Sequence, residues 1–165
     1  LEKAMNDSRS IRDDAAKAKE KADQAAKNAQ ARVDATDKTK LDKESILRML
    51  RATYWASEVP ESELWESILN SRSYGLYAQT GEQAGFARMV TDMTRLAWLS
   101  DVYVLPVHRG RGLGKWLVDT IVSDPALARI KRIVLSTRDA HSLYERMGFS
   151  LIGGEEADRM MMLVR

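Results

Sequence analysis

The chain has 165 residues, and 44% of them are hydrophobic, which is enough for one domain of ordinary size with a buried core. Lysine and arginine number 26 against 24 aspartate and glutamate, and this near balance argues against a general attraction to nucleic acid or an anionic membrane. Cysteine is absent, which excludes a disulfide framework and a thiol nucleophile. No apolar run approaches the about 20 residues of a membrane-spanning helix, so we expect a cytoplasmic protein.

Residues 1–30 differ in composition from the rest of the chain, because they are rich in alanine and lysine and contain neither glycine nor proline. Apolar residues, mostly alanine, recur there at steps of four and three, which predicts a long helix. This helical arm is either an oligomerising coil, which would make a homo-oligomer, or an appended charged helix, since alanine buries little area. Residues 9–34 are similar to the alanine-rich coil of the murein outer-membrane lipoproteins. Leu1 in place of methionine predicts a fragment or a processed chain.

A short strand over 32–36 and two helices are predicted to open the globular domain, which we place at 31–165. Asp42 is a typical helix N-cap, and apolar residues at helical spacing follow it as far as Tyr54. Pro60 favours the first turn of a second helix.

From Ser73 onward the apolar pattern changes to a period of two, which is typical of strands. Strands are predicted over 73–79, 83–91 and 98–105, with Gly81 in the turn between the first two. These segments predict an antiparallel meander.

A basic glycine-rich turn follows the third of these strands, after Pro106. It reads Arg109-Gly110-Arg111-Gly112-Leu113-Gly114-Lys115, and apolar residues at helical spacing follow it. Glycines allow close approach of an anion, and the first N–H groups of a helix favour negative charge, so the turn is either a phosphate cradle or a solvated basic turn. The spacing fits neither the nucleotide triphosphatase loop nor the dinucleotide fingerprint.

The last part of the chain is predicted to contain a strand over 131–137, a short helix over 138–147, and a closing hairpin of 149–152 and 160–164. Together the elements predict an α/β (α+β) fold with a mixed, mostly antiparallel sheet that helices cover on both faces.

Two segments of this sequence resemble motifs of the GNAT acetyltransferase superfamily. Arg109 to Gly114 is similar to the pattern R/Q-x-x-G-x-G/A, and Ala140 to Phe149, AHSLYERMGF, is similar to A-x-x-L-Y-x-x-x-G-F. One predicted helix and one predicted strand lie between the two motifs. The resemblance implies a GNAT-like fold that binds acetyl-CoA as a cosubstrate, with its pyrophosphate on the glycine turn, and uses no metal ion.

The resemblance also implies which residues bind the coenzyme. These are Val102, Tyr103, Val104, Arg109, Gly110, Arg111, Gly112, Leu113, Gly114, Lys115 and Thr137. Thr137 stands where the superfamily often has an asparagine, so the hydrogen bonds at this position are left open.

The candidate catalytic residues are Tyr144 and Asp101. By resemblance Tyr144 lies near the coenzyme sulfur and donates a proton to the leaving thiolate; the alternative is a packed tyrosine whose hydroxyl is bonded elsewhere. Asp101 is a candidate base, although an aspartate in a strand also bonds backbone groups. Glu58, Glu61 and His141 are further candidates.

The first two helices help to form the acceptor side of the cleft in the superfamily, so Tyr54, Trp55 and Trp65 either line a substrate pocket or belong to the core. We therefore predict an N-acetyltransferase that acts on a primary amine of a small molecule or peptide by direct attack, since there is no cysteine to carry the acetyl group. The alternative is a non-catalytic acyl-CoA sensor or interaction module. The acceptor itself is not encoded in either motif.

Overall fold

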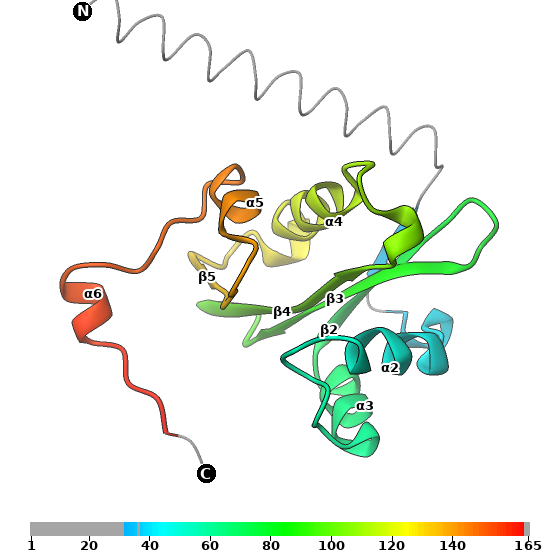
Figure 1. Ribbon diagram of the computed structural model, residues 1–165. Helices are drawn as coiled ribbons and strands as arrows, with labels where there is room; N and C mark the ends of the chain where they lie inside the picture. Colours follow the sequence, from blue (N-terminus) through cyan, green and yellow to red (C-terminus); the bar gives the residue numbers. More distant parts are fainter. Residues whose placement is uncertain (1–31, 36, 164–165) are drawn as a thin grey trace, which may run out of the picture.

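The computed structural model describes residues 32–35 and 37–163 (Figure 1). The helical arm predicted over 1–30, and the homo-oligomer that it would form, lie outside these residues.

A mixed sheet forms the centre of the domain. Its five strands are β1 (Arg32–Ala35), β2 (Arg72–Tyr77), β3 (Gln83–Thr91), β4 (Leu96–Val104) and β5 (Arg132–Val134), and they are adjacent in that order. Neighbours from β1 to β4 pair antiparallel, whereas β5 pairs parallel to β4. The predicted mixed, mostly antiparallel sheet is therefore confirmed, although β5 is shorter than expected.

Helices cover both faces of this sheet, as predicted. The described helices are α2 (Lys43–Arg51), α3 (Glu61–Leu69), α4 (Leu113–Val122), α5 (His141–Glu145) and α6 (Glu155–Asp158), with short 3-10 helices at Lys38–Lys40, Pro106–His108 and Pro125–Leu127. Of these, α2, α3 and α4 pack on the sheet. In Figure 1, α2 and α3 lie against one face of the sheet, and α4 lies against the other.

The α2 helix begins where the sequence predicts and ends earlier. The Asp42 carboxylate accepts a hydrogen bond from the Ser45 N–H at 3.0 Å, which caps the first turn. At the other end, the Thr53 hydroxyl donates to the Leu50 carbonyl at 2.6 Å and satisfies one of the carbonyls that a helix end leaves free. The helix therefore stops at Arg51, and the prediction that it reaches Tyr54 is wrong.

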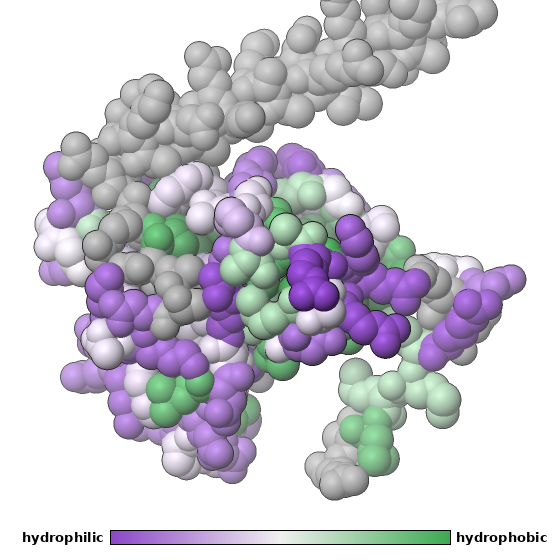
Figure 2. Space-filling model, turned by 180° about the vertical axis from the view of Figure 1, so that it is seen from behind, coloured by the Kyte–Doolittle hydropathy of each residue, from purple (hydrophilic) through white to green (hydrophobic). Residues whose placement is uncertain are grey.

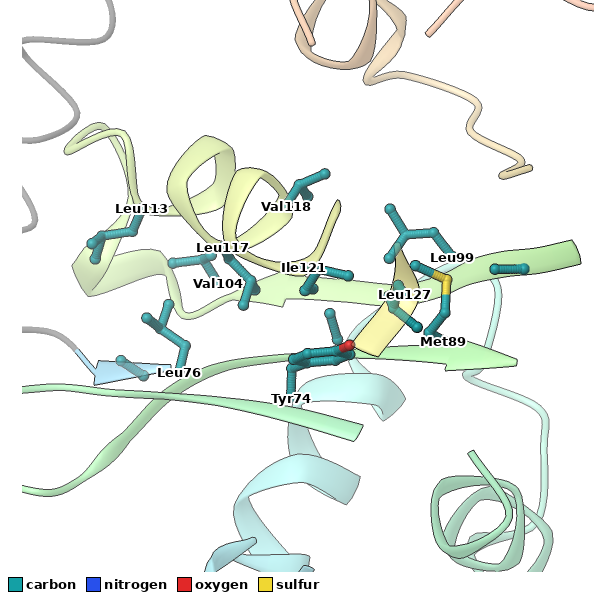
Figure 3. Close-up of a cluster of buried hydrophobic side chains, with 13 residues drawn as sticks. Tyr74, Leu76, Met89, Leu99, Val104, Leu113, Leu117, Val118, Ile121 and Leu127 are labelled. Carbon is teal, nitrogen blue, oxygen red and sulfur yellow. The ribbon is translucent and has the colours of Figure 1, made fainter. Parts of the chain in front are cut away.

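Two hydrophobic cores, one on each face, hold the helices on the sheet. The first lies between α4 and strands β2 to β4, where Leu117 and Ile121 are fully buried (Figure 3). The second lies between α2, α3 and β3, where Ile46, Ile68 and Phe86 are fully buried. Because β3 sends alternate side chains to opposite faces, it contributes to both cores.

A polar cluster ties β2 to the end of α4. The Arg72 guanidinium donates to the Asp124 carboxylate at 2.7 Å, and the Tyr74 hydroxyl donates to the same oxygen at 2.9 Å. Asp124 also accepts from the Ala126 N–H at 2.9 Å, so one carboxylate joins a strand, a helix end and the following turn.

The predicted closing hairpin of 149–152 and 160–164 is wrong within the described residues. The chain turns at Gly148, Phe149 packs against the first core, and the following segment to Leu163 contains only α6. Met161 and Leu163 are 97% and 77% exposed, and Figure 2 shows this segment standing apart from the rest of the domain. Met160 to Leu163 is an unbroken apolar run with no alternation, so the pattern specifies neither a buried face nor a strand partner.

In the part of the chain that the structure describes, no helix combines the length and apolar composition needed to cross a bilayer.

Candidate functional site

A cavity of about 1460 Å³ opens where β4 and β5 separate. The two strands pair only at Leu96 to Trp98 with Arg132 to Val134, and beyond this point the residues that follow them line the cavity. The glycine turn, α5, α3, the loop between α2 and α3, and Arg88 of β3 also contribute to its wall. Residues of both sequence motifs therefore line the same cavity.

A β-bulge shapes the middle of the β4 wall. Asp101 and Val102 together face one residue of β3, because the register between these strands shifts at this point. Asp101 has a φ of 55°, a left-handed value that aspartate tolerates better than most residues. A bulge leaves its extra residue outside the ladder, so backbone polar groups are available next to the cavity.

The Asp101 carboxylate is almost fully buried, and both of its oxygens have partners. Its side chain is 4% exposed and forms an ion pair with Arg88 on β3. The other oxygen accepts from the Trp55 indole N–H at 3.1 Å and the Ser100 hydroxyl at 3.3 Å. Asp101 therefore fixes Arg88 and Trp55 at the wall of the cavity.

The glycine turn presents the N-terminus of α4 to the cavity. Gly110 and Gly112 have φ values of 74° and 78°, which residues with a Cβ rarely adopt. The first hydrogen bond of α4 runs from the Trp116 N–H to the Gly112 carbonyl at 3.0 Å. The amide groups just before Trp116 consequently have no acceptor within the helix, and Gly112 has no side chain to cap them. This arrangement suits an anion.

The cations of the turn differ in position. Arg109 and Lys115 line the cavity, whereas Arg111 is exposed and is not among the lining residues. Arg109 donates from Nε to the Val104 carbonyl at 2.8 Å, which leaves its terminal nitrogens for a ligand. Lys115 forms an ion pair with Asp119 one turn later in α4.

Tyr144 lies on α5 in the cavity wall, with its ring edge-on to Phe149 at a centroid distance of 5.7 Å. The pKa of the Tyr144 phenol is raised above its ordinary value of 10.0. Burial is the largest cause, and the nearby Tyr54 and Asp139 add to it. Within the described residues the hydroxyl has no hydrogen-bond partner. Tyr144 is therefore a neutral phenol at pH 7 with a proton to donate.

The other predicted site residues are divided between the cavity and the rest of the domain. Thr137 lines the cavity, and its hydroxyl accepts from the Ala140 N–H at 3.0 Å, which shapes the entry to α5.

Tyr54 and Trp55 also line the cavity, with their rings edge-on at a centroid distance of 4.8 Å. Trp65 instead packs against the second core. The alternative bases Glu58, Glu61 and His141 lie outside the lining.

Several lining residues are not identified by the sequence analysis. Arg88 shares the face of β3 that carries Phe86, so strand alternation alone could have placed it beside the acceptor side. Arg138 and Arg146 line the cavity from the α5 end. No local pattern marks them, because their place depends on how α5 packs.

The comparisons with known proteins agree with this geometry. A family model described as "Acetyltransferase (GNAT) family" matches residues 43–149. A protein of Gibberella zeae named "Putative acetyltransferase FG08082" is 32% identical over 111 residues, which are 55% of this chain and 62% of that protein, less than two thirds of its length.

Solved structures agree as well. The structure of a Xanthomonas campestris pv. campestris protein, described as "a putative acetyltransferase belonging to the gnat family", is similar with a TM-score of 0.75 and 37% identity over 82% of this chain and 93% of that one. A Deinococcus radiodurans R1 structure, at 20% identity over 83% of this chain and 90% of that one and a TM-score of 0.59, shares the fold.

Proposed function

Because this chain belongs to the GNAT acetyltransferase family, we propose that it transfers the acetyl group of acetyl-CoA to a primary amine of a small molecule or peptide, in the cytoplasm. The observation that carries this proposal is one cavity with an anion-binding helix N-terminus in its wall and a neutral phenol in the same wall. Anion binding and proton donation are the two functions that coenzyme binding and thiolate departure require.

The residues present fit the coenzyme. The two glycines at positive φ and the uncapped amides of α4 would hold the pyrophosphate, together with Arg109 and Lys115. The wall from Val102 to Val104, with Thr137 opposite it, would contact the pantetheine arm. When bound, acetyl-CoA supplies an acetyl group activated as a thioester.

The chemistry of this chain's own residues follows from their surroundings. The Tyr144 hydroxyl would give its proton to the leaving thiolate, and backbone N–H groups at the β4 bulge would stabilise negative charge on the attacked carbonyl. Because both Asp101 oxygens are engaged, we assign this residue the task of holding Arg88 and Trp55 in place. Tyr54 and Trp55 would contact the acceptor.

A screen of primary amines with acetyl-CoA tests the proposal, with free thiol as the readout and calorimetry for coenzyme binding. Thiol release that depends on the amine supports it. Coenzyme binding without turnover of any amine would instead favour the alternative, a non-catalytic acyl-CoA sensor or interaction module.

A further inference from the structure

The loop between α2 and α3 is held at two points on opposite sides of the cavity. On one side, the Trp55 indole donates to Asp101 at the β4 bulge. On the other side, the adjacent Tyr54 contacts Arg138, which follows β5 and precedes α5. The loop therefore spans from one wall of the cavity to the other.

The contact between Tyr54 and Arg138 has two parts. The Arg138 backbone N–H donates to the Tyr54 hydroxyl at 2.9 Å, and the Arg138 guanidinium lies 3.7 Å from the centroid of the Tyr54 ring. Both residues are exposed, Tyr54 by 43%. Cation–π contacts at exposed sites are weak, so this contact can open and close without disturbing either core.

The contact lies close to the proposed reaction centre. Tyr54 is near enough to Tyr144 to raise the pKa of its phenol, and Tyr54, Arg138 and Tyr144 all line the same cavity. The glycine turn that would hold the phosphates comes from a different part of the wall. An acceptor amine must enter this cavity to reach Tyr144, and Tyr54 and Arg138 form part of its wall.

We propose that Tyr54 and Arg138 form a clasp across the cavity, and that this clasp sets the size of the acceptor that is acetylated. The inference rests on the proposed acetyl transfer and adds to it two specificity-determining residues. Small amines reach the reaction centre with the clasp closed, whereas bulky amines require it to open.

Three variants separate the two parts of the clasp. Tyr54→Phe removes the hydrogen bond and keeps the ring, Arg138→Ala removes the guanidinium and keeps the backbone N–H, and Tyr54→Ala removes both contacts. Arg129→Ala is the matched control, because Arg129 is also exposed and does not line the cavity.

The measurement is kcat/KM for propylamine and for tryptamine, two primary alkylamines of very different size. In Tyr54→Ala we expect the tryptamine to propylamine ratio to rise about tenfold, the scale on which pocket shape discriminates between substrates, with smaller rises in Tyr54→Phe and Arg138→Ala. The control should keep the wild-type ratio, and coenzyme affinity by calorimetry should be the same in all five proteins.

A second readout is independent of turnover. Hydrogen exchange at the Arg138 amide should accelerate in Tyr54→Phe and Tyr54→Ala, because its acceptor is removed, and should stay unchanged in the control. An unchanged amine ratio in Tyr54→Ala, or an equal fall in kcat/KM for both amines, would overturn the clasp and leave the proposed acetyl transfer standing. If wild type acetylates no primary amine in a screen that includes propylamine, tryptamine and peptides, the proposed function fails, and the specificity role fails with it.

Discussion

At the scale of single residues, the proposal divides chemistry from coenzyme binding. Tyr144→Phe keeps the ring that packs on Phe149 and removes only the hydroxyl. Loss of a general acid typically lowers the rate about 10²- to 10⁴-fold, so we expect a fall of this size in single-turnover experiments with little change in coenzyme affinity. Because the pKa of this phenol is raised, any loss of wild-type activity that comes from deprotonation of Tyr144 should begin only above the ordinary tyrosine value of 10.0.

The matched control for Tyr144→Phe is Tyr77→Phe, which removes a phenol hydroxyl that donates to the Lys40 carbonyl away from the cavity. Equal single-turnover rates in wild type and Tyr144→Phe would remove Tyr144 from the mechanism. Weaker binding with an unchanged chemical step would make it a binding residue.

The glycine turn supports a second prediction. Arg109→Ala would remove the proposed charge-assisted contact to phosphate, worth about 1.5–3 kcal/mol, and Gly112→Ala forces a Cβ onto a residue with a φ of 78°. Both variants should bind coenzyme A more weakly in calorimetry while retaining the fold by circular dichroism. Arg129→Ala removes the same charge outside the cavity and should bind like wild type. Unchanged affinity in both turn variants contradicts the assignment of this turn to the pyrophosphate.

At the scale of elements, the position of α4 depends on Asp124 as well as on the core beneath the helix. Burial by itself raises the pKa of this carboxyl, but the hydrogen bonds from the Ala126 N–H, Arg72 and Tyr74 outweigh it, so the pKa is lowered overall. A lowered folded-state pKa contributes stability that is present above the unfolded value of about 3.8 and is lost as the pH falls through the folded value.

This linkage gives the third prediction. Asp124→Asn removes the charge that three donors share, and it should lower the free energy of unfolding at pH 7 by about 1–3 kcal/mol. Urea unfolding from pH 7 to pH 3 measures the effect, and the difference between wild type and variant should shrink toward the acid end. A difference that is constant with pH would show that the charge of Asp124 does not contribute.

Another consequence at this scale concerns the bulge in β4. It brings Asp101 beside Arg88 and the indole of Trp55, residues that lie far apart in the chain. The proposed acceptor residue Trp55 is therefore anchored to a strand, while the proposed clasp residues Tyr54 and Arg138 lie on loops.

At the scale of the whole molecule, the sheet separates the two hydrophobic cores, and the cavity lies where its parallel pair of strands diverges. The α4 core supports the glycine turn, and the core around α2 and α3 supports the loop that carries Tyr54 and Trp55. The proposed coenzyme and acceptor sides would thus be held by different cores, which the central strands join.

The fourth prediction concerns residues 1–30. If their alanine pattern is an oligomerising coil, deleting them should reduce the molar mass measured by light scattering and leave coenzyme binding intact, since such a coil would form a unit separate from the cavity. The full chain at the same concentration is the control. An unchanged mass after deletion would leave the arm as an appended helix without a role in assembly.

Local patterns were sufficient for most of the fold. Period-two alternation predicts β3 over the same residues that the structure shows, and the capping aspartate predicts the start of α2, because both depend on neighbours in sequence. The hairpin predicted at the end of the chain failed for the same reason, since an apolar run cannot specify a distant strand partner.

The motifs likewise identify the glycine turn and Tyr144, whose positions depend on one turn and one short helix. Three features were decided by tertiary structure alone. They are the position of Arg138 in the cavity wall, the ion pair of Arg88 with Asp101, and the position of Arg111 and Trp65 outside the cavity lining. Each depends on contacts between segments that only packing of the sheet and helices brings together. The residues that we propose for coenzyme binding could therefore be predicted from consecutive positions in the sequence. The residues that we propose for the acceptor are brought together by long-range packing, which a local pattern does not encode.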